Sequence, residues 1–332
     1  MDALTELAKM GEALSALRWV QGPGGNVSVK TDGTLLVKAS GVRLRDVGSA
    51  KGHTKVPLAD ATAALGGDKD ADARVFACAP RPSLETYFHA LPARAIAHTH
   101  ALGVLLYACA AYRGARPDGV TAQVPYARPG HGLAVAVRDV YQKDVEEQAI
   151  ILLSHGIIVA APTAERAVAL TRAIDESIRS RFGALPAFEP LVAKYMEATP
   201  SGVAGGVLRA LPPRTSNATA TTPPRYLFPD AVVCASTVLV DAMTDVAALA
   251  ARSIAETKGR SHVLTGDDGQ RAIVAKSAAQ LDQSTEVLAA HDWVEDALNA
   301  EGGATYLHDD EPARLLSLPS EQYRIRLAAD QR

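Results

Sequence analysis

Hydrophobic residues recur at helical spacing at the start of the chain. Over residues 2–19, charged side chains alternate with apolar residues that share one helical face, namely Leu4, Leu7, Ala8, Leu14 and Leu17. This spacing predicts an amphipathic helix that lies on a sheet. The runs 27–30 and 34–38 then indicate two short strands joined through Thr31-Asp32-Gly33. An Asp-Gly turn between two such runs is typical of a β-hairpin.

A short helix and a strand are predicted next along the chain. Ser83 opens the run 84–91 and Pro92 closes it, which indicates a short helix with Ser83 as its N-cap. The run 94–100 predicts a strand. The alanine- and leucine-rich stretch after this strand predicts another helix.

A mostly apolar run covers residues 149–160 and is interrupted by Ser154-His155-Gly156. It is too short to span a membrane and favours a buried strand or a pair of strands. A helix is then expected to begin after Pro162-Thr163 and to end near Gly183.

Composition changes between about residues 199 and 229, where Pro, Gly, Ser and Thr become frequent. A chain of 332 residues also has room for two domains, at roughly 150 residues per domain. We therefore predict a first domain at 1–198, a linker at 199–224 and a smaller C-terminal domain of unknown role at 225–332. Strands are predicted in this last domain at 231–233, 261–264 and 271–274.

Composition and charge exclude several classes of protein. The chain is 48% hydrophobic and 21% charged, as a folded globular protein is. A formal net charge of −3, without basic clusters, argues against nucleic-acid or membrane partners. Three widely spaced cysteines form no C-x-x-C pair, which indicates neither a disulfide framework nor a structural zinc site. The N-terminus carries no basic stretch before an apolar run, so we expect a cytoplasmic protein.

Three histidines are candidate metal ligands. On a strand, side chains two positions apart share a face, so His98 and His100 can present two imidazoles to one ion. His155 interrupts an apolar run before Gly156, where the backbone can turn closely beside an ion. The alternative for His155 is a core histidine with satisfied hydrogen bonds. Three histidines with one open position are the ligand set of a catalytic zinc ion.

Two further side chains are candidates for proton transfer. Glu85 falls in the first turn of the predicted short helix, where the helix dipole favours an anion. It fits a catalytic base or a fourth, exchangeable metal ligand, and the alternative is an exposed first-turn glutamate. Tyr126 follows Pro125 and fits a proton donor, although a packed loop tyrosine has the same local pattern.

Two small-residue motifs place backbone N–H groups where they can cradle an anion. They contain Gly25 with Asn26, and Ser40 with Gly41, and Ser83 at a helix N-terminus is a third such element. The alternative for either glycine motif is a simple turn.

In chain order, these motifs resemble the class II aldolase/adducin family over about residues 5–185. The segments that carry the resemblance are Gly25-Asn26-Val27-Ser28, Lys38-Ala39-Ser40-Gly41, Pro82-Ser83-Leu84-Glu85-Thr86, His98-Thr99-His100, Pro125-Tyr126-Ala127 and Ser154-His155-Gly156. The resemblance implies zinc bound by His98, His100 and His155, with Glu85 as acid/base. In the fuculose-phosphate and rhamnulose-phosphate aldolases of this family, phosphate lies in the glycine loops and beside the serines. Leu84 replaces one such serine here, which argues against a phosphorylated substrate.

The resemblance also implies a fold and an assembly. The fold is a three-layer α/β/α domain around a mixed, largely antiparallel sheet. The assembly is a homo-oligomer, commonly a cyclic tetramer, in which Tyr126 reaches the site of a neighbouring subunit and donates a proton.

Our hypothesis is a zinc-dependent aldolase-type lyase that acts on a small sugar, sugar acid or sugar phosphate through an enediolate. One alternative is an epimerase, dehydratase or decarboxylase on the same scaffold. Another is a non-catalytic interaction module like that of adducin, against which the intact histidines and Glu85 argue. The sequence carries no G-x-G-x-x-G motif, so we expect no hydride chemistry.

Overall fold

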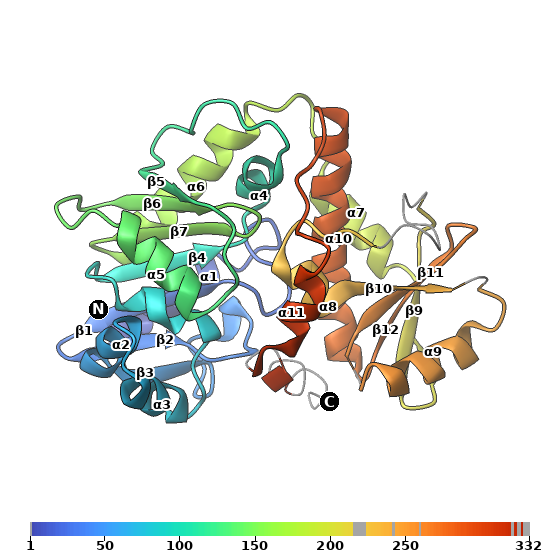
Figure 1. Ribbon diagram of the computed structural model, residues 1–332, viewed down its shortest axis with the longest axis horizontal. Coiled ribbons are helices and arrows are strands. Elements are labelled where there is room, and N and C mark those ends of the chain that lie inside the picture. Colours follow the sequence, from blue (N-terminus) through green and yellow to red (C-terminus); the bar gives the residue numbers. More distant parts are fainter. Residues whose placement is uncertain are drawn as a thin grey trace. The chain divides into compact units, whose positions relative to one another are not determined.

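The computed structural model of the protein describes residues 2–214, 224–240, 243–258, 260–319, 322–323 and 327. The chain divides into two compact units (Figure 1). The first contains the residues up to Ala184 together with Glu301–Gly303. The second contains Leu185–Ala300 and the described residues from Ala304 onward. In the part of the chain described here, no helix combines the length and apolarity that a membrane span requires.

One seven-stranded sheet is the centre of the first unit. Its strands are β1 (Asn26–Thr31), β2 (Thr34–Lys38), β3 (His53–Pro57), β4 (Ala95–Thr99), β5 (Ala122–Val124), β6 (Gln148–Leu152) and β7 (Gly156–Ala161). They lie in the order β3-β2-β1-β4-β7-β6-β5. Every neighbouring pair is antiparallel except β5 and β6, which run parallel. The mixed, largely antiparallel sheet that the resemblance implied is thereby confirmed.

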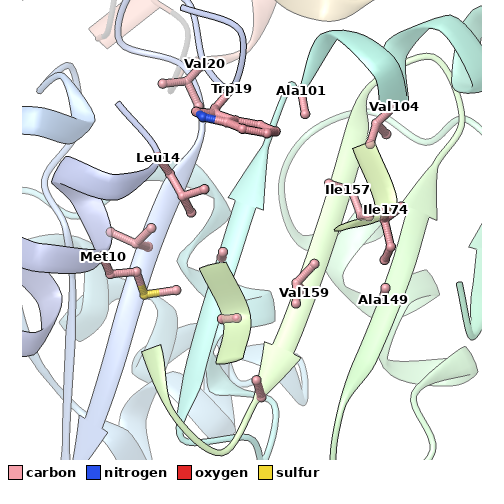
Figure 2. Packing of buried hydrophobic residues seen from close by; sticks show 14 of the residues in the cluster. Met10, Leu14, Trp19, Val20, Ala101, Val104, Ala149, Ile157, Val159 and Ile174 are labelled. Atoms are coloured by element: carbon pink, nitrogen blue, oxygen red, sulfur yellow. The ribbon is translucent and has the colours of Figure 1, made fainter. Parts of the chain in front are cut away.

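Helices cover both faces of this sheet (Figure 1). They are α1 (Ala3–Ala13), η1 (Leu44–Asp46), α2 (Leu58–Leu65), α3 (Lys69–Ala77), η2 (Leu84–Ala90), α4 (Leu102–Cys109), α5 (His131–Val140) and α6 (Ala164–Arg179). Successive strand residues point to opposite faces. Ile157 and Val159 therefore join a core with α1, α4 and α6 (Figure 2), while Ile158 joins a second core with α2, α3, η2 and α5. These two cores give the three predicted layers.

Several predicted elements of the first unit are confirmed. β1 and β2 form the predicted hairpin, and Gly33 turns it with a φ of +69°. The apolar run 149–160 is the strand pair β6 and β7. The N-terminal helix is present but ends at Ala13, because the chain turns there and brings Trp19 into the core.

The second unit is built around a five-stranded mixed sheet. Its strands are β8 (Ser201–Val203), β9 (Gly206–Leu211), β10 (Ser236–Val240), β11 (His262–Gly266) and β12 (Arg271–Ala275), in the order β10-β11-β12-β9-β8. The helices of this unit are α7 (Phe188–Met196), α8 (Pro229–Ala235), α9 (Val246–Glu256), α10 (Ala278–Ala300) and α11 (Glu311–Ser317). On one face, Ala250 and Ile254 of α9 pack against Leu264 and Val274. A smaller α/β unit follows the first, as predicted.

Two details of the second unit differ from the sequence-based expectations. Residues 201–211, expected within the linker 199–224, form β8 and β9 around a turn at Gly205, whose φ is +84°. The glycines that suggested a flexible linker instead belong to a hairpin. Residues 215–223 of that range lie outside the described residues. The first compact unit consists of the residues up to Ala184 and Glu301–Gly303, whereas the first domain was expected to run to residue 198.

The strand predicted at 231–233 is wrong, because these residues belong to α8. Pro229 stands in the first turn of this helix, where a missing N–H has no helical partner to lose. Asp230 adds a negative charge that favours the helix N-terminus. The strand β10 begins only at Ser236.

Candidate active site

His98 and His100 stand at the end of β4. His98 pairs in register with Asn26 of β1 and Ile158 of β7. The Nδ1 atom of His98 lies 3.0 Å from the carbonyl oxygen of Ile157, an acceptor only, so Nδ1 donates and the lone pair of Nε2 is available to a ligand. The Nε2 atoms of His98 and His100 face each other at 3.1 Å.

His155 comes from the turn between β6 and β7. Ser154 before it has a φ of +53°, which few non-glycine residues adopt. A Cβ atom on Gly156 would lie 2.3 Å from the carbonyl oxygen of Thr99 and 3.1 Å from Cδ2 of His100. Only glycine therefore lets β7 begin this close to β4, and this close packing brings His155 to the other two rings.

The three histidines form one buried group. Their ligand atoms all lie within 4.8 Å of one another, and each side chain belongs to a residue no more than 4% exposed. Two nitrogen ligands of a tetrahedral zinc ion, each about 2.0–2.1 Å from the metal, would lie about 3.3 Å apart, close to the separation between His98 and His100. Burial lowers the pKa of His98 to about 3, so this imidazole is neutral near pH 7, as a ligand must be. The donor set fits a divalent cation.

Glu85 reaches the histidines from η2. Ser83 is the N-cap of η2 and accepts a hydrogen bond from the backbone N–H of Glu85 at 3.3 Å. The two carboxylate oxygens lie 3.4 Å from Nε2 of His98 and 3.2 Å from Nε2 of His155. Burial alone would raise the pKa of Glu85, but His98 and His155 outweigh burial wherever their rings carry a proton and lower this pKa below its ordinary value. Both oxygens of Glu85 thus lie against histidine rings at the centre of the group.

Asn26 connects Glu85 to the sheet. Its Nδ2 atom donates to Oε2 of Glu85 at 3.0 Å, and its Oδ1 atom lies 2.5 Å from Nε2 of His89. Both ends of the amide are therefore bonded within the protein. This side-chain role was not foreseen from the sequence, where the expected role was anion binding through the backbone, which stays a prediction.

Lys38 links the predicted anion-binding segments. Its buried ammonium donates to the carbonyl oxygens of Pro23, at 2.9 Å, and Val42, at 2.7 Å, one in each glycine loop. Its backbone carbonyl accepts from the N–H of Ser83 at 3.1 Å. One lysine thus connects the two glycine loops with Ser83.

Gly25 shows why the first loop needs glycine. Its φ is +61°, and a Cβ there would lie 2.8 Å from the carbonyl oxygen of His98. The backbone before β1 consequently packs directly against the end of β4. Anion binding by this motif stays a prediction.

Tyr126 lies half-buried in the loop between β5 and α5. Its role as a proton donor stays a prediction. Sequence reasoning also missed the contacts of His89 and of the Lys38 ammonium.

One signal for the contacts of His89 was available in the sequence. The alternation of polar and apolar residues along β1 places Asn26 and Ser28, the two partners of His89, on one face of the strand.

Comparisons with known proteins agree with this geometry. The sequence profile of the family described as Class II Aldolase and Adducin N-terminal domain matches residues 5–181, just over half of the chain. None of the curated proteins compared with the chain matches it.

Among solved structures, three similar chains illustrate the range of relatives. The N-terminal class II aldolase domain of a conserved protein from Thermoplasma acidophilum is 26% identical, with 54% of this chain and 93% of that chain covered and a TM-score of 0.46. YgbL from Klebsiella pneumoniae, described as a candidate aldolase/epimerase/decarboxylase, is 22% identical, with coverage of 54% and 87% and a TM-score of 0.41. An L-fuculose-1-phosphate aldolase from Thermus thermophilus is 20% identical, with coverage of 53% and 91% and a TM-score of 0.40.

Proposed function

Because the chain belongs to the family of class II aldolases and adducin N-terminal domains, we propose that its first unit is a metal-dependent carbon–carbon lyase. The substrate is a small sugar, sugar acid or sugar phosphate, and the reaction passes through an enediolate. The observation that carries the proposal is the buried group of three imidazoles, two of which contact the carboxylate of Glu85. Burial of so many polar groups is unfavourable without a function, and an interaction module has no need of them.

Zinc or another divalent cation would be held by His98, His100 and His155. When bound, the cation supplies Lewis-acid polarisation of the substrate carbonyl. The neutral state of His98 supports this assignment. So does the buried Oε1 atom of Glu85, which has no well-formed hydrogen bond among the described residues.

Glu85 is the proton carrier of the mechanism. In the condensation direction, its carboxylate removes a C–H proton beside the carbonyl of a hydroxyketone, and the resulting enediolate carbon forms a bond to the aldehyde carbon of the second substrate. Tyr126, supplied by a neighbouring copy of the chain, gives its hydroxyl proton to the aldehyde oxygen. In cleavage, the phenolate of Tyr126 takes back this proton, the carbon–carbon bond breaks, and Glu85 returns a proton to carbon.

The segments around Lys38 would bind the anionic end of the substrate. Gly25, Ser40, Gly41 and Ser83 present small side chains and backbone N–H groups there. Leu84 offers no hydroxyl to this end, so we propose that a carboxylate or a neutral sugar is preferred over a phosphate ester.

The first test is the metal content of variants. His98→Ala should abolish both the bound cation and activity, because one of three ligands is lost. His53→Ala is the matched control, because the ring of this half-buried histidine of the same unit forms a hydrogen-bond contact with the carbonyl oxygen of Val47, away from Glu85 and the three candidate ligands. Elemental analysis of the purified proteins measures the difference. Full metal stoichiometry in His98→Ala would refute the assignment.

Product analysis then identifies the reaction. L-fuculose 1-phosphate, unphosphorylated ketoses and sugar acids are incubated with the metal-loaded protein, and the products are identified by NMR. Two carbonyl fragments from one substrate support the lyase. An epimer, a dehydrated product or carbon dioxide would show instead that the site catalyses epimerisation, dehydration or decarboxylation. A purified protein without metal would favour the interaction module.

A further inference from the structure

A chain of four polar side chains runs through the buried face of β1. Asn26 and Ser28 stand two positions apart on this face, with His89 of η2 between them and Glu85 beyond. The Nδ1 atom of His89 lies 2.7 Å from the hydroxyl of Ser28. Its Nε2 atom lies 2.5 Å from Oδ1 of Asn26, whose Nδ2 donates to Glu85. All four residues are buried, and His89 and Ser28 are fully buried.

The direction of every hydrogen bond in this chain follows from the orientation of the Asn26 amide. The Nδ2 atom of Asn26 donates to Oε2 of Glu85, so its Oδ1 atom, which can only accept, faces Nε2 of His89. Nε2 of His89 must then carry the proton, and Nδ1 must accept from the hydroxyl of Ser28. Burial, and next the nearby charge of Lys30, lower the pKa of His89 well below its ordinary value, which agrees with a neutral ring.

We propose that His89, supported by Ser28, is a positioning residue that holds the amide of Asn26 and thereby fixes the carboxylate of Glu85 beside the three histidines. The inference rests on the proposed function, in which Glu85 carries the proton. The chain does not conduct protons itself, because the amide of Asn26 is bonded at both ends and has no proton to relay.

The environment of Glu85 explains why a positioning residue is needed. Oε1 lies 3.2 Å from Nε2 of His155 but has no well-formed hydrogen bond among the described residues, so the bond from Asn26 to Oε2 is the best-formed restraint on the plane of the carboxylate. Glu85 itself stands on the short 3₁₀ segment η2. A residue that holds a catalytic side chain in place through hydrogen bonds commonly controls activity without contacting substrate.

The first test replaces His89 by each of two amides. Glutamine can put its amide nitrogen where Nε2 stands and can donate to Asn26, whereas the shorter asparagine reaches only the position of Nδ1. The probe is the exchange of C–H protons of dihydroxyacetone and its phosphate for deuterium in deuterated water, followed by NMR. We expect kcat to fall about 10–100-fold in His89→Ala and His89→Asn, with KM little changed, and to be largely restored in His89→Gln. Equal losses in the glutamine and asparagine variants would overturn the proposal.

Metal content and a matched control separate positioning from general damage. The His89 variants should keep the metal stoichiometry of the wild-type protein, because all three imidazole ligands remain. His262→Ala is the control, because His262 is also fully buried and lies 2.7 Å from a serine hydroxyl, that of Ser253 in the second unit. This control should lower stability and leave the exchange rate per folded molecule unchanged. Loss of metal in His89→Gln would assign His89 a structural role instead.

A double-mutant cycle tests whether His89 acts through Glu85. In the background Glu85→Gln, the further change His89→Ala should have no additional effect on the residual rate, because the group that His89 positions is already lost. An undiminished effect of His89→Ala in that background would overturn the proposal.

The tautomer of His89 gives a readout that needs neither metal nor substrate. Long-range ¹H–¹⁵N correlation spectra of protein labelled at histidine, assigned with His89→Gln, should show the proton on Nε2. A proton on Nδ1 would reverse every bond in the chain and overturn the proposal. If the wild-type protein lacks metal and exchange activity but shows the Nε2–H tautomer, the proposed function fails while the hydrogen-bond chain stands.

Discussion

Asp175 caps the N-terminus of α4, the helix that follows β4 and its histidines. Although it belongs to α6, its Oδ1 atom accepts hydrogen bonds from the backbone N–H groups of Gly103, at 2.6 Å, and Val104, at 3.3 Å, in the first turn of α4. Its Oδ2 atom accepts from Arg18 at 3.2 Å. The carboxylate is fully buried. It therefore determines how the chain turns from His100 into α4.

The change in the free energy of unfolding when Asp175 is removed follows from these partners. Asp175→Ala leaves two buried N–H groups without an acceptor, at about 1–3 kcal/mol each. The side chain of Arg18 is 34% exposed, so water can solvate its guanidinium once Asp175 is lost and the ion pair adds little. We therefore expect the free energy of unfolding of the first unit to fall by about 2–5 kcal/mol.

Asp175→Asn separates the hydrogen bonds from the charge. Burial raises the pKa of Asp175 in spite of Arg18, so its negative charge is not itself a source of stability. Asparagine keeps one acceptor oxygen for the helix and should lower the free energy of unfolding by only about 1 kcal/mol. It should also retain the metal, whereas Asp175→Ala should bind it more weakly.

Urea unfolding followed by tryptophan fluorescence measures these differences. The chain has two tryptophans, Trp19 in the first unit and Trp293 in the second, so a Trp293→Phe background reports the first unit alone. Asp245→Ala is the control, because Asp245 is an exposed N-cap in the second unit. The reasoning is refuted if Asp175→Ala costs less than about 1 kcal/mol, or if Asp175→Asn is equally destabilising.

Two further predictions concern strands β7 and β1. Gly156→Ala should lower the free energy of unfolding by about 1–3 kcal/mol and weaken metal binding, because the new Cβ would lie 2.3 Å from the carbonyl oxygen of Thr99. A variant with nearly the stability and the metal content of the wild-type protein would contradict this prediction. Burial lowers the pKa of Lys30 from 10.5 to about 7. Between these values the unfolded chain binds more protons, so the stability of the wild-type protein should rise with pH, and Lys30→Met should remove this rise. An unchanged slope in Lys30→Met, from urea unfolding at pH 7.5, 9 and 10, would exclude Lys30 as its source.

Elements that depend on neighbouring residues were predictable from sequence. The β1–β2 hairpin follows from its Asp-Gly turn, and the short helix follows from the N-cap Ser83 and from Pro92. The H-x-H spacing also sufficed to place two rings on one side of β4. In each case the deciding interaction spans only a few residues.

Features that depend on distant residues were not predictable. No local sequence pattern indicates that Asn26 lies opposite His98 in the register of β1 and β4. The hydrogen bonds from Asn26 to Glu85 and His89 could therefore not be inferred. The strand prediction at residues 231–233 failed for a related reason. Val232 and Val233 are β-branched and favour a strand, but Pro229 and packing within the second unit make these residues helical.

The strand β1 serves two purposes at once, and this limits how its sequence can vary. Val27 and Val29 fill the hydrophobic core on one face, while Asn26 and Ser28 belong to the hydrogen-bond chain on the other. Of its six residues, only Thr31 is exposed. Natural variation in this strand should therefore concentrate at that last position, whereas most surface strands tolerate exchange at every second residue. A library randomised over β1 would yield few folded, active members.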